Sequence, residues 1–140
     1  MSMTVQCLEV GPLEANCYVV GCSQTGLGFI VDPGGDGPLI LDTVRRLGLT
    51  ITHIFNTHCH PDHIGANCEV RDGLAATQVQ APVILVHEAE REAVERPPLQ
   101  WLLIGLRPAP CRVDGVLTEG MELAIGQLQV RVLHLPGHSP

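Results

Sequence analysis

Short apolar runs separated by glycine and proline dominate the pattern of this chain. Glycine-proline pairs such as Gly11-Pro12, and the Asp32–Gly35 stretch, lie between apolar runs and mark turns. Apolar or alternating residues predict a strand in each of eight stretches: Val5–Val10, Cys17–Val20, Gly28–Val31, Ile51–Asn56, Pro82–Val86, Val113–Leu117, Glu122–Ile125 and Leu128–Leu133.

Three other stretches have helical character. Apolar residues recur with helical spacing within Leu39–Leu47, and Gly48 can cap the carboxyl end of that helix. We expect a second helix within Ile64–Val79, interrupted near Gly73, and an acidic helix over Glu88–Glu95. Helices inserted among strands predict an α/β (α+β) layered fold rather than a helical bundle. The pattern leaves the parallel or antiparallel sense of the strands open.

Length and composition narrow the class of protein. The 140 residues fit a single domain over 1–140, and 45% hydrophobic content excludes a disordered chain. The net charge is -7, and all eight basic residues are arginines that form no cluster, so we expect no nucleic-acid partner. Apolar runs such as Trp101–Leu106 are too short to span a membrane, so we expect no membrane partner.

The cysteines indicate the kind of cellular compartment, reducing or oxidising, in which the protein is expected. None of the six forms a C-x-x-C pair, and the first ten residues lack a basic segment followed by a long apolar one. We therefore expect a cytoplasmic protein with reduced thiols. Cys7 and Cys17 lie among apolar residues and are expected to be small buried side chains.

A histidine-rich segment directly follows the predicted strand Ile51–Asn56. It reads Thr57-His58-Cys59-His60-Pro61-Asp62-His63. Alternate residues of an extended chain project to the same side, so His58 and His60 can reach one cation, while Cys59 points away. Asp62 and His63 can face the same pocket from the following turn. Zinc and iron(II) both accept imidazole and carboxylate ligands, so the pattern predicts a metal site rather than a histidine-rich surface loop.

Thr57–Gly65 resembles the H-x-H-x-D-H signature of the metallo-β-lactamase fold superfamily. Ile30–Gly35 is similar to the turn below the metal site of that family, and Leu133–Pro140 to the loop that supplies its next histidine. Asn16–Val20 looks like the second strand of the glyoxalase II-like (hydroxyacylglutathione hydrolase-like) branch. The resemblance implies the N-terminal part of an αββα sandwich.

The resemblance also implies a set of metal ligands. His58, His60 and His138 would hold one metal, and Asp62 and His63 would contribute to a second. Zinc is the expected ion, one or two per chain, with iron and manganese left open. The family's bridging aspartate and last histidine follow the loop of His138, so we expect the C-terminal part of the domain to be missing here. A chain without that part favours one metal or none, and its exposed apolar face would favour a homo-oligomer.

The implied reaction is metal-dependent hydrolysis. A bound divalent metal lowers the pKa of its water far below that of bulk water, to about 7, so that hydroxide forms at neutral pH. Asp62 could orient or deprotonate that water as the catalytic residue. The resemblance suggests a small-molecule substrate, an acylated glutathione thioester, from which glutathione departs as a thiolate. A mononuclear iron persulfide dioxygenase, as in a sister branch, and an inactive metal-binding fragment remain as alternatives.

Two further polar residues lie near this segment in the predicted fold. Asp32 follows an apolar strand and either serves the turn or orients a ligand histidine from behind. His53 lies within a strand, and we expect it to be a packed or edge histidine rather than a ligand.

Overall fold

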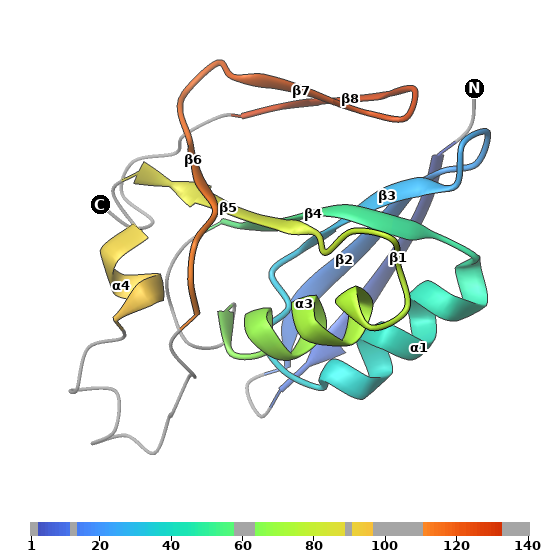
Figure 1. The fold of residues 1–140 in the computed structure, drawn as a ribbon, viewed down its shortest axis with the longest axis horizontal. Coiled ribbons are helices and arrows are strands. Elements are labelled where there is room, and N and C mark those ends of the chain that lie inside the picture. Colours follow the sequence, from blue (N-terminus) through green and yellow to red (C-terminus); the bar gives the residue numbers. More distant parts are fainter. Residues whose placement is uncertain (1–2, 12–13, 58–63, 89–90, 97–110, 133–140) are drawn as a thin grey trace.

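The computed structural model describes residues 3–11, 14–57, 64–88, 91–96 and 111–132 (Figure 1). Within this part of the chain lie eight strands and three helices in mixed order. They are β1 (Met3–Val10), β2 (Ala15–Cys22), β3 (Leu27–Val31), α1 (Gly37–Leu47), β4 (Thr50–Asn56), α3 (Asn67–Ala75), β5 (Val83–His87), α4 (Arg91–Glu95), β6 (Gly115–Leu117), β7 (Glu122–Ile125) and β8 (Leu128–Arg131).

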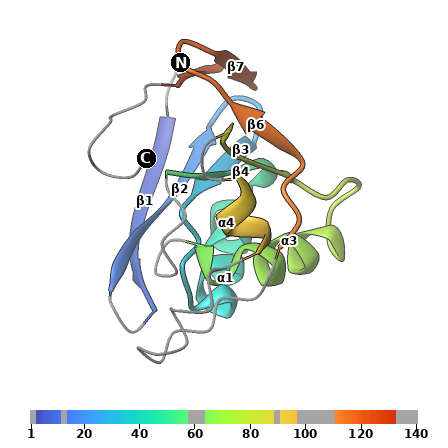
Figure 2. The same ribbon diagram turned by 90° about the vertical axis from the view of Figure 1, so that its left-hand side faces the viewer.

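Strands β1 to β6 form one sheet in sequence order, with β1 and β6 at opposite edges (Figure 2). The pairs β1–β2 and β2–β3 are antiparallel, whereas β3–β4, β4–β5 and β5–β6 are parallel. Helix α1 connects β3 to β4, and α3 lies between β4 and β5, as parallel neighbours require. The predicted α/β class is confirmed, and the sheet is mixed.

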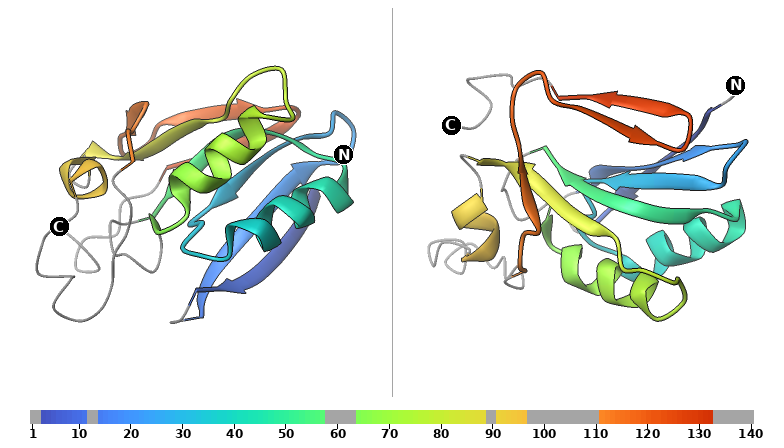
Figure 3. Two further views of the ribbon diagram at one scale, coloured as in Figure 1. Left: turned by 60° about the horizontal axis from the view of Figure 1, so that its bottom comes forward. Right: turned by 45° about the horizontal axis from the view of Figure 1, so that its top comes forward.

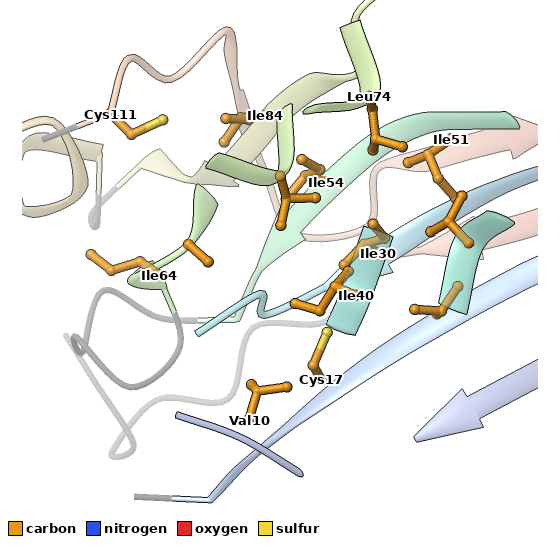
Figure 4. Packing of buried hydrophobic residues seen from close by; sticks show 14 of the residues in the cluster. Val10, Cys17, Ile30, Ile40, Ile51, Ile54, Ile64, Leu74, Ile84 and Cys111 are labelled. Atoms are coloured by element: carbon orange, nitrogen blue, oxygen red, sulfur yellow. The ribbon is translucent and has the colours of Figure 1, made fainter. Parts of the chain in front are cut away.

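Helices cover one face of this sheet, and the pair β7–β8 lies over part of the other (Figure 3). On one face α1 and α3 pack, and Figure 4 shows Ile40 and Leu74 of these helices facing Ile30 and Ile54 of the strands. On the other face the antiparallel pair β7–β8 covers a second cluster that includes Phe29 and Phe55. Successive strand residues alternate between the two clusters because their side chains point to opposite faces.

The expected interruption of the second helix near Gly73 is wrong. Helix α3 continues through Gly73 to Ala75. A Cβ atom at Gly73 would lie 2.6 Å from Cδ1 of Leu41, which belongs to α1. The glycine therefore allows the two helices to pack closely, and this packing outweighs its weak helix propensity of about 1 kcal/mol.

The cysteines differ from expectation at two places. Cys68 of α3 and Cys111 form a disulfide, with their Cα atoms 5.6 Å apart, so the expectation of reduced thiols is wrong for this pair. Spacing rules consider neighbouring cysteines, whereas the fold brings together two that are 43 residues apart. Cys7 is exposed, because in β1 it points away from the face on which Leu8 packs against the core. The expected burial of Cys17 is confirmed.

The face of β1 and β2 that carries Cys7 also exposes apolar side chains. Met3 is 59% exposed, Val5 51% and Tyr18 38%. These strands therefore expose apolar side chains, whereas the apolar face left by a missing layer and the homo-oligomer inferred from it stay predictions. In the described ranges, no helix has the length and apolar character needed to cross a membrane.

Candidate metal centre

The residue that precedes the histidine-rich segment, Thr57, follows the carboxyl end of the parallel strand β4. Val31 of β3 is paired with Phe55 of β4, so Asp32 and Asn56 leave the sheet at the same end. Ligands of α/β proteins bind beyond the carboxyl ends of such strands. His58, His60, Asp62, His63 and His138 lie outside the described residues, whereas the residues that flank 58–63 are described.

Asp32 is fastened to the residue that precedes His58. Its Oδ1 accepts a hydrogen bond of 2.7 Å from the backbone N–H of Thr57, and its Oδ2 accepts one of 2.6 Å from the hydroxyl of Thr57. The backbone N–H of Asp32 donates to the carbonyl of Phe55 at 2.9 Å. Asp32 is only 4% exposed, so its carboxylate needs such partners to offset the loss of water.

Asp32 adopts a left-handed backbone conformation with φ of 56°. For a residue with a side chain, this conformation costs on the order of 1 kcal/mol, and it persists where surrounding bonds fix it. Here the contacts to Thr57 and Phe55 provide those bonds. The sequence left open whether Asp32 serves the turn or orients a ligand histidine. In the structure it binds Thr57, the residue immediately before His58.

Asn56 and Asn67 join the two sides of the same segment. The amide nitrogen of Asn67 donates to Oδ1 of Asn56 at 2.7 Å, and that of Asn56 donates to Oδ1 of Asn67 at 3.1 Å. Asn56 is 3% exposed and Asn67 1% exposed, so this reciprocal pair is buried. The end of β4 and the start of α3 are therefore held side by side.

A further bond and an apolar anchor hold the carboxyl end of the segment. The backbone N–H of Ala66 donates to the carbonyl of Pro33 at 2.8 Å, directly after Asp32 in the turn below. Ile64 is buried in the core cluster, where Figure 4 shows it. Both ends of the stretch 58–63 are thus attached to the same turn between β3 and α1.

Sequence reasoning missed Asn56 and Asn67 as positioning residues. A signal was present at Asn56, a polar amide that directly follows the buried apolar residues Ile54 and Phe55 at the end of the strand. A buried polar side chain demands a partner. The identity of that partner, 11 residues away across the histidine-rich stretch, follows only from the fold.

His53 lies within β4, three residues before Asn56. Its ring stacks on Phe55, with the centroids 5.6 Å apart, and its Nδ1 lies 2.7 Å from Oγ1 of Thr52. Burial lowers the pKa of His53 below its ordinary value, so the ring is neutral at pH 7. The expectation of a packed histidine is confirmed.

A hollow of about 780 Å³ lies at the opposite end of the sheet, beside the start of β4. Its lining includes Leu41, Leu49, Thr52 and Gln78. In the part of the chain that the structure describes, no three histidine, cysteine or acidic side chains lie close enough to hold a metal ion. The candidate centre therefore depends on the segment that Asp32 and the two asparagines hold.

Residues 10–140 match the family model of the metallo-beta-lactamase superfamily. The chain belongs to this superfamily. The resemblance inferred from the motifs is thereby confirmed, and the mixed sheet with helices agrees with that fold.

Two curated relatives match almost the whole chain. A probable metallo-hydrolase, YqgX of Bacillus subtilis (strain 168), is 36% identical over 135 residues, which is 95% of this chain and 60% of that protein. A hydroxyacylglutathione hydrolase of Rhodospirillum rubrum is 34% identical over 140 residues, which is 97% of this chain and 44% of that protein. The chain thus spans about half the length of these relatives.

Solved structures agree with the fold. The BLEG-1 B3 metallo-beta-lactamase has a TM-score of 0.83 at 35% identity, covering 98% of this chain and 64% of that one. TTHA1623 in a di-iron-bound form has a TM-score of 0.74 at 31% identity, covering 97% and 63%. ETHE1 from Myxococcus xanthus has a TM-score of 0.68 at 25% identity, covering 97% and 50%.

Proposed function

We propose that this chain is part of a metal-dependent hydrolase that cleaves a thioester of the hydroxyacylglutathione type. Membership of the superfamily and the relationship to the hydroxyacylglutathione hydrolase of Rhodospirillum rubrum support the reaction class. The observation that carries the proposal is the pair of bonds from Thr57 to Asp32, which fixes the chain next to His58 at the carboxyl end of β4.

The donor set fits a divalent metal. We propose that His58, His60 and His138 hold one ion and that Asp62 and His63 contribute to a second. Imidazole and carboxylate donors suit zinc and iron(II), and manganese accepts the carboxylate. When bound, such an ion would supply hydroxide at neutral pH and polarise the carbonyl of the substrate. Three histidines leave the vertex that a catalytic rather than structural zinc requires.

The residues of the chain divide the remaining tasks. Asp62 is the proposed catalytic residue, because a carboxylate beside the attacking water can orient it and accept its proton. Asp32, Asn56 and Asn67 have a positioning role, because they hold the residues on both sides of the stretch in which Asp62 lies. The thiolate released from a thioester is a good leaving group, so the mechanism needs no strong general acid.

The proposed substrate is a small molecule. A net charge of -7 and the absence of a basic cluster in the sequence argue against nucleic acid. The cytoplasmic location inferred from the sequence stays a prediction, and the Cys68–Cys111 disulfide is a feature more common outside reducing compartments.

Activity measurements test the proposal directly. We expect the zinc-loaded chain to hydrolyse an acylated glutathione thioester, and we expect Asp62→Asn to lower kcat by at least a hundredfold with zinc still bound. Asp42→Asn, an exposed change on α1, is the matched control and should leave kcat unchanged. Equal activity of Asp62→Asn and the unaltered chain would contradict the role of Asp62.

The similarity to ETHE1 from Myxococcus xanthus favours a second candidate, an iron-dependent persulfide dioxygenase. Such an enzyme would consume oxygen when given a glutathione persulfide and would require iron, whereas the hydrolase requires neither oxygen nor a redox change. A chain that binds metal but turns over neither substrate would instead be the inactive fragment.

A further inference from the structure

The two sulfurs of the Cys68–Cys111 disulfide have unequal surroundings. Cys111 is 3% exposed and belongs to the core cluster between the sheet and the helices. Cys68 is only partly buried and lies in the first turn of α3. Cys68 is therefore the more exposed residue of the pair, although it also packs against the core cluster, and we take its sulfur as the one that a solute reaches first.

A cation lies beside the accessible sulfur. Nη2 of Arg71 is 3.3 Å from Sγ of Cys68, and Nη1 of the same residue donates to the carbonyl of Arg112 at 3.4 Å. The side chain of Arg71 is 22% exposed and its Nε pairs with Oδ1 of Asp72 at 3.4 Å, so water and this exposed carboxylate each screen part of its charge. A guanidinium in this position stabilises the negative charge that Cys68 acquires when the disulfide opens.

The segment that carries Cys111 has anchors of its own. Oε2 of Glu95 accepts a hydrogen bond of 3.0 Å from the N–H of Val113, and Asp114 exchanges two hydrogen bonds of 2.8 Å with Ile84 of β5. These contacts do not involve the disulfide. The two sulfurs are therefore expected to stay close after the bond opens, so that it can form again.

We propose that Cys68 and Cys111 are a redox-active pair that exchanges with low-molecular-weight disulfides and thiols of the glutathione type. Cys68 is the attacking sulfur and Cys111 the resolving one. The inference is separate from the proposed hydrolase function, because none of these groups belongs to the proposed metal ligands or to the residues 58–63.

The exchange follows ordinary thiol chemistry. In the reduced protein the thiolate of Cys68 attacks one sulfur of glutathione disulfide, forming a mixed disulfide and releasing one glutathione thiolate. The thiol of Cys111 loses its proton to water and attacks the sulfur of Cys68, which releases the second glutathione thiolate. The protein loses two electrons and two protons, and one glutathione disulfide becomes two glutathione molecules. Two glutathione molecules reverse the sequence.

Two variants, each of which keeps only one cysteine of the pair, test the direction of the exchange. Both are built in a Cys7→Ser background, because Cys7 is exposed and would react by itself. With glutathione disulfide, we expect Cys111→Ser to gain one glutathionyl group on Cys68 at least about tenfold faster than Cys68→Ser gains one on Cys111. Intact mass and peptide mapping give the rate and the site. Equal rates, or a faster reaction at Cys111, would overturn the proposal.

Arg71→Gln in the Cys111→Ser variant tests the role of the cation. We expect the reaction at Cys68 to slow about threefold at neutral pH, because a smaller thiolate fraction is partly offset by a higher intrinsic nucleophilicity. Arg45→Gln is the matched control, since Arg45 lies on α1 and pairs with Asp42. An unchanged rate in Arg71→Gln would remove Arg71 from the mechanism.

A redox titration of the unaltered protein covers the case in which Cys68→Ser or Cys111→Ser fails to fold. After equilibration at graded ratios of glutathione to glutathione disulfide, alkylation and mass analysis give the oxidised fraction of the pair. We expect this fraction to follow the ratio reversibly. A pair that stays fully oxidised, or fully reduced, at every ratio would contradict the proposal.

Discussion

Asn56 and Asn67 bind each other through two hydrogen bonds between their buried side-chain amides, of 2.7 and 3.1 Å. Asn56 ends β4 and Asn67 begins α3, so this pair spans the whole histidine-rich stretch. Together with Asp32, it gives that stretch two fixed ends at the carboxyl edge of the parallel strands. Residues on both sides of 58–63 are thus held by contacts among the described residues.

Alanine substitution of either asparagine should destabilise the fold and the two effects should not add. Asn67→Ala leaves the buried amide of Asn56 without one of its partners, which costs about 1 to 3 kcal/mol in the free energy of unfolding. The double variant Asn56→Ala/Asn67→Ala should lose less than the sum, with a coupling of roughly 0.5 to 3 kcal/mol. Urea unfolding of the four proteins measures this. Additive losses would show that the pair does not act as a unit.

Changes at Asp32 should weaken metal binding through Thr57. Asp32→Asn replaces one of the two carboxylate oxygens that accept bonds from Thr57, and we expect zinc affinity to fall by about tenfold or more, as for other groups that orient metal ligands. Thr57→Val keeps the backbone N–H and removes only the hydroxyl donor, so its effect should be smaller. Asp42→Asn on the exposed face of α1 is the control. Calorimetric titration with zinc measures all three, and equal affinities would contradict this positioning role.

The stability of the fold should depend on His53 between about pH 5.5 and pH 7.5. Burial lowers the pKa of His53 in the folded chain below 6.5, so the unfolded chain takes up the proton first as the pH falls. His53 therefore contributes stability above the unfolded pKa that is lost below it, by at most about 1.4 kcal/mol per pH unit.

The measurement for His53 compares unfolding curves at the two ends of this range. His53→Gln should lose less stability than the unaltered chain when the pH falls from about 7.5 to about 5.5, because glutamine does not titrate. Other histidines contribute equally to both proteins and cancel in the comparison. Identical pH dependence would show that His53 does not titrate differently in the folded and unfolded chains.

Reduction of the disulfide should lower the free energy of unfolding without unfolding the chain. A cross-link over 43 residues restricts the unfolded state by roughly 4 kcal/mol of loop-closure free energy. We expect dithiothreitol to shift the urea midpoint downward by a corresponding amount. The double variant Cys68→Ser/Cys111→Ser should show the lower midpoint with and without the reductant. If dithiothreitol leaves the urea midpoint of the unaltered protein unchanged, the disulfide does not stabilise the fold and the prediction is contradicted.

The elements of the fold were predictable where local pattern and global packing agree. Helix α1 combines helical spacing with a cap at Gly48, which adopts the left-handed conformation with φ of 68°. The strands were found because their apolar residues alternate or run continuously. The error at Gly73 arose because its reason lies in another helix, at Leu41.

The candidate site also has features that the sequence could predict and features that it could not. The ligand types at His58, His60 and Asp62 are a local pattern, so the sequence alone indicates the kind of chemistry. The residues that hold this segment come from elsewhere in the chain: Asp32 is 25 residues from Thr57, and Asn67 is 11 residues from Asn56. The first contact depends on the register of β3 against β4 and the second on the packing of α3 beside the end of β4, and no local pattern specifies either.

Metal binding by two histidine variants tests the central claim most directly. The unaltered chain is dialysed against zinc and its bound metal is measured beside His58→Ala and His53→Ala. We predict about one zinc per unaltered chain, a similar amount in His53→Ala, and a loss of at least tenfold in affinity in His58→Ala. Metal content that is the same in His58→Ala and in the unaltered chain, or no bound metal in any of the three, would contradict the account.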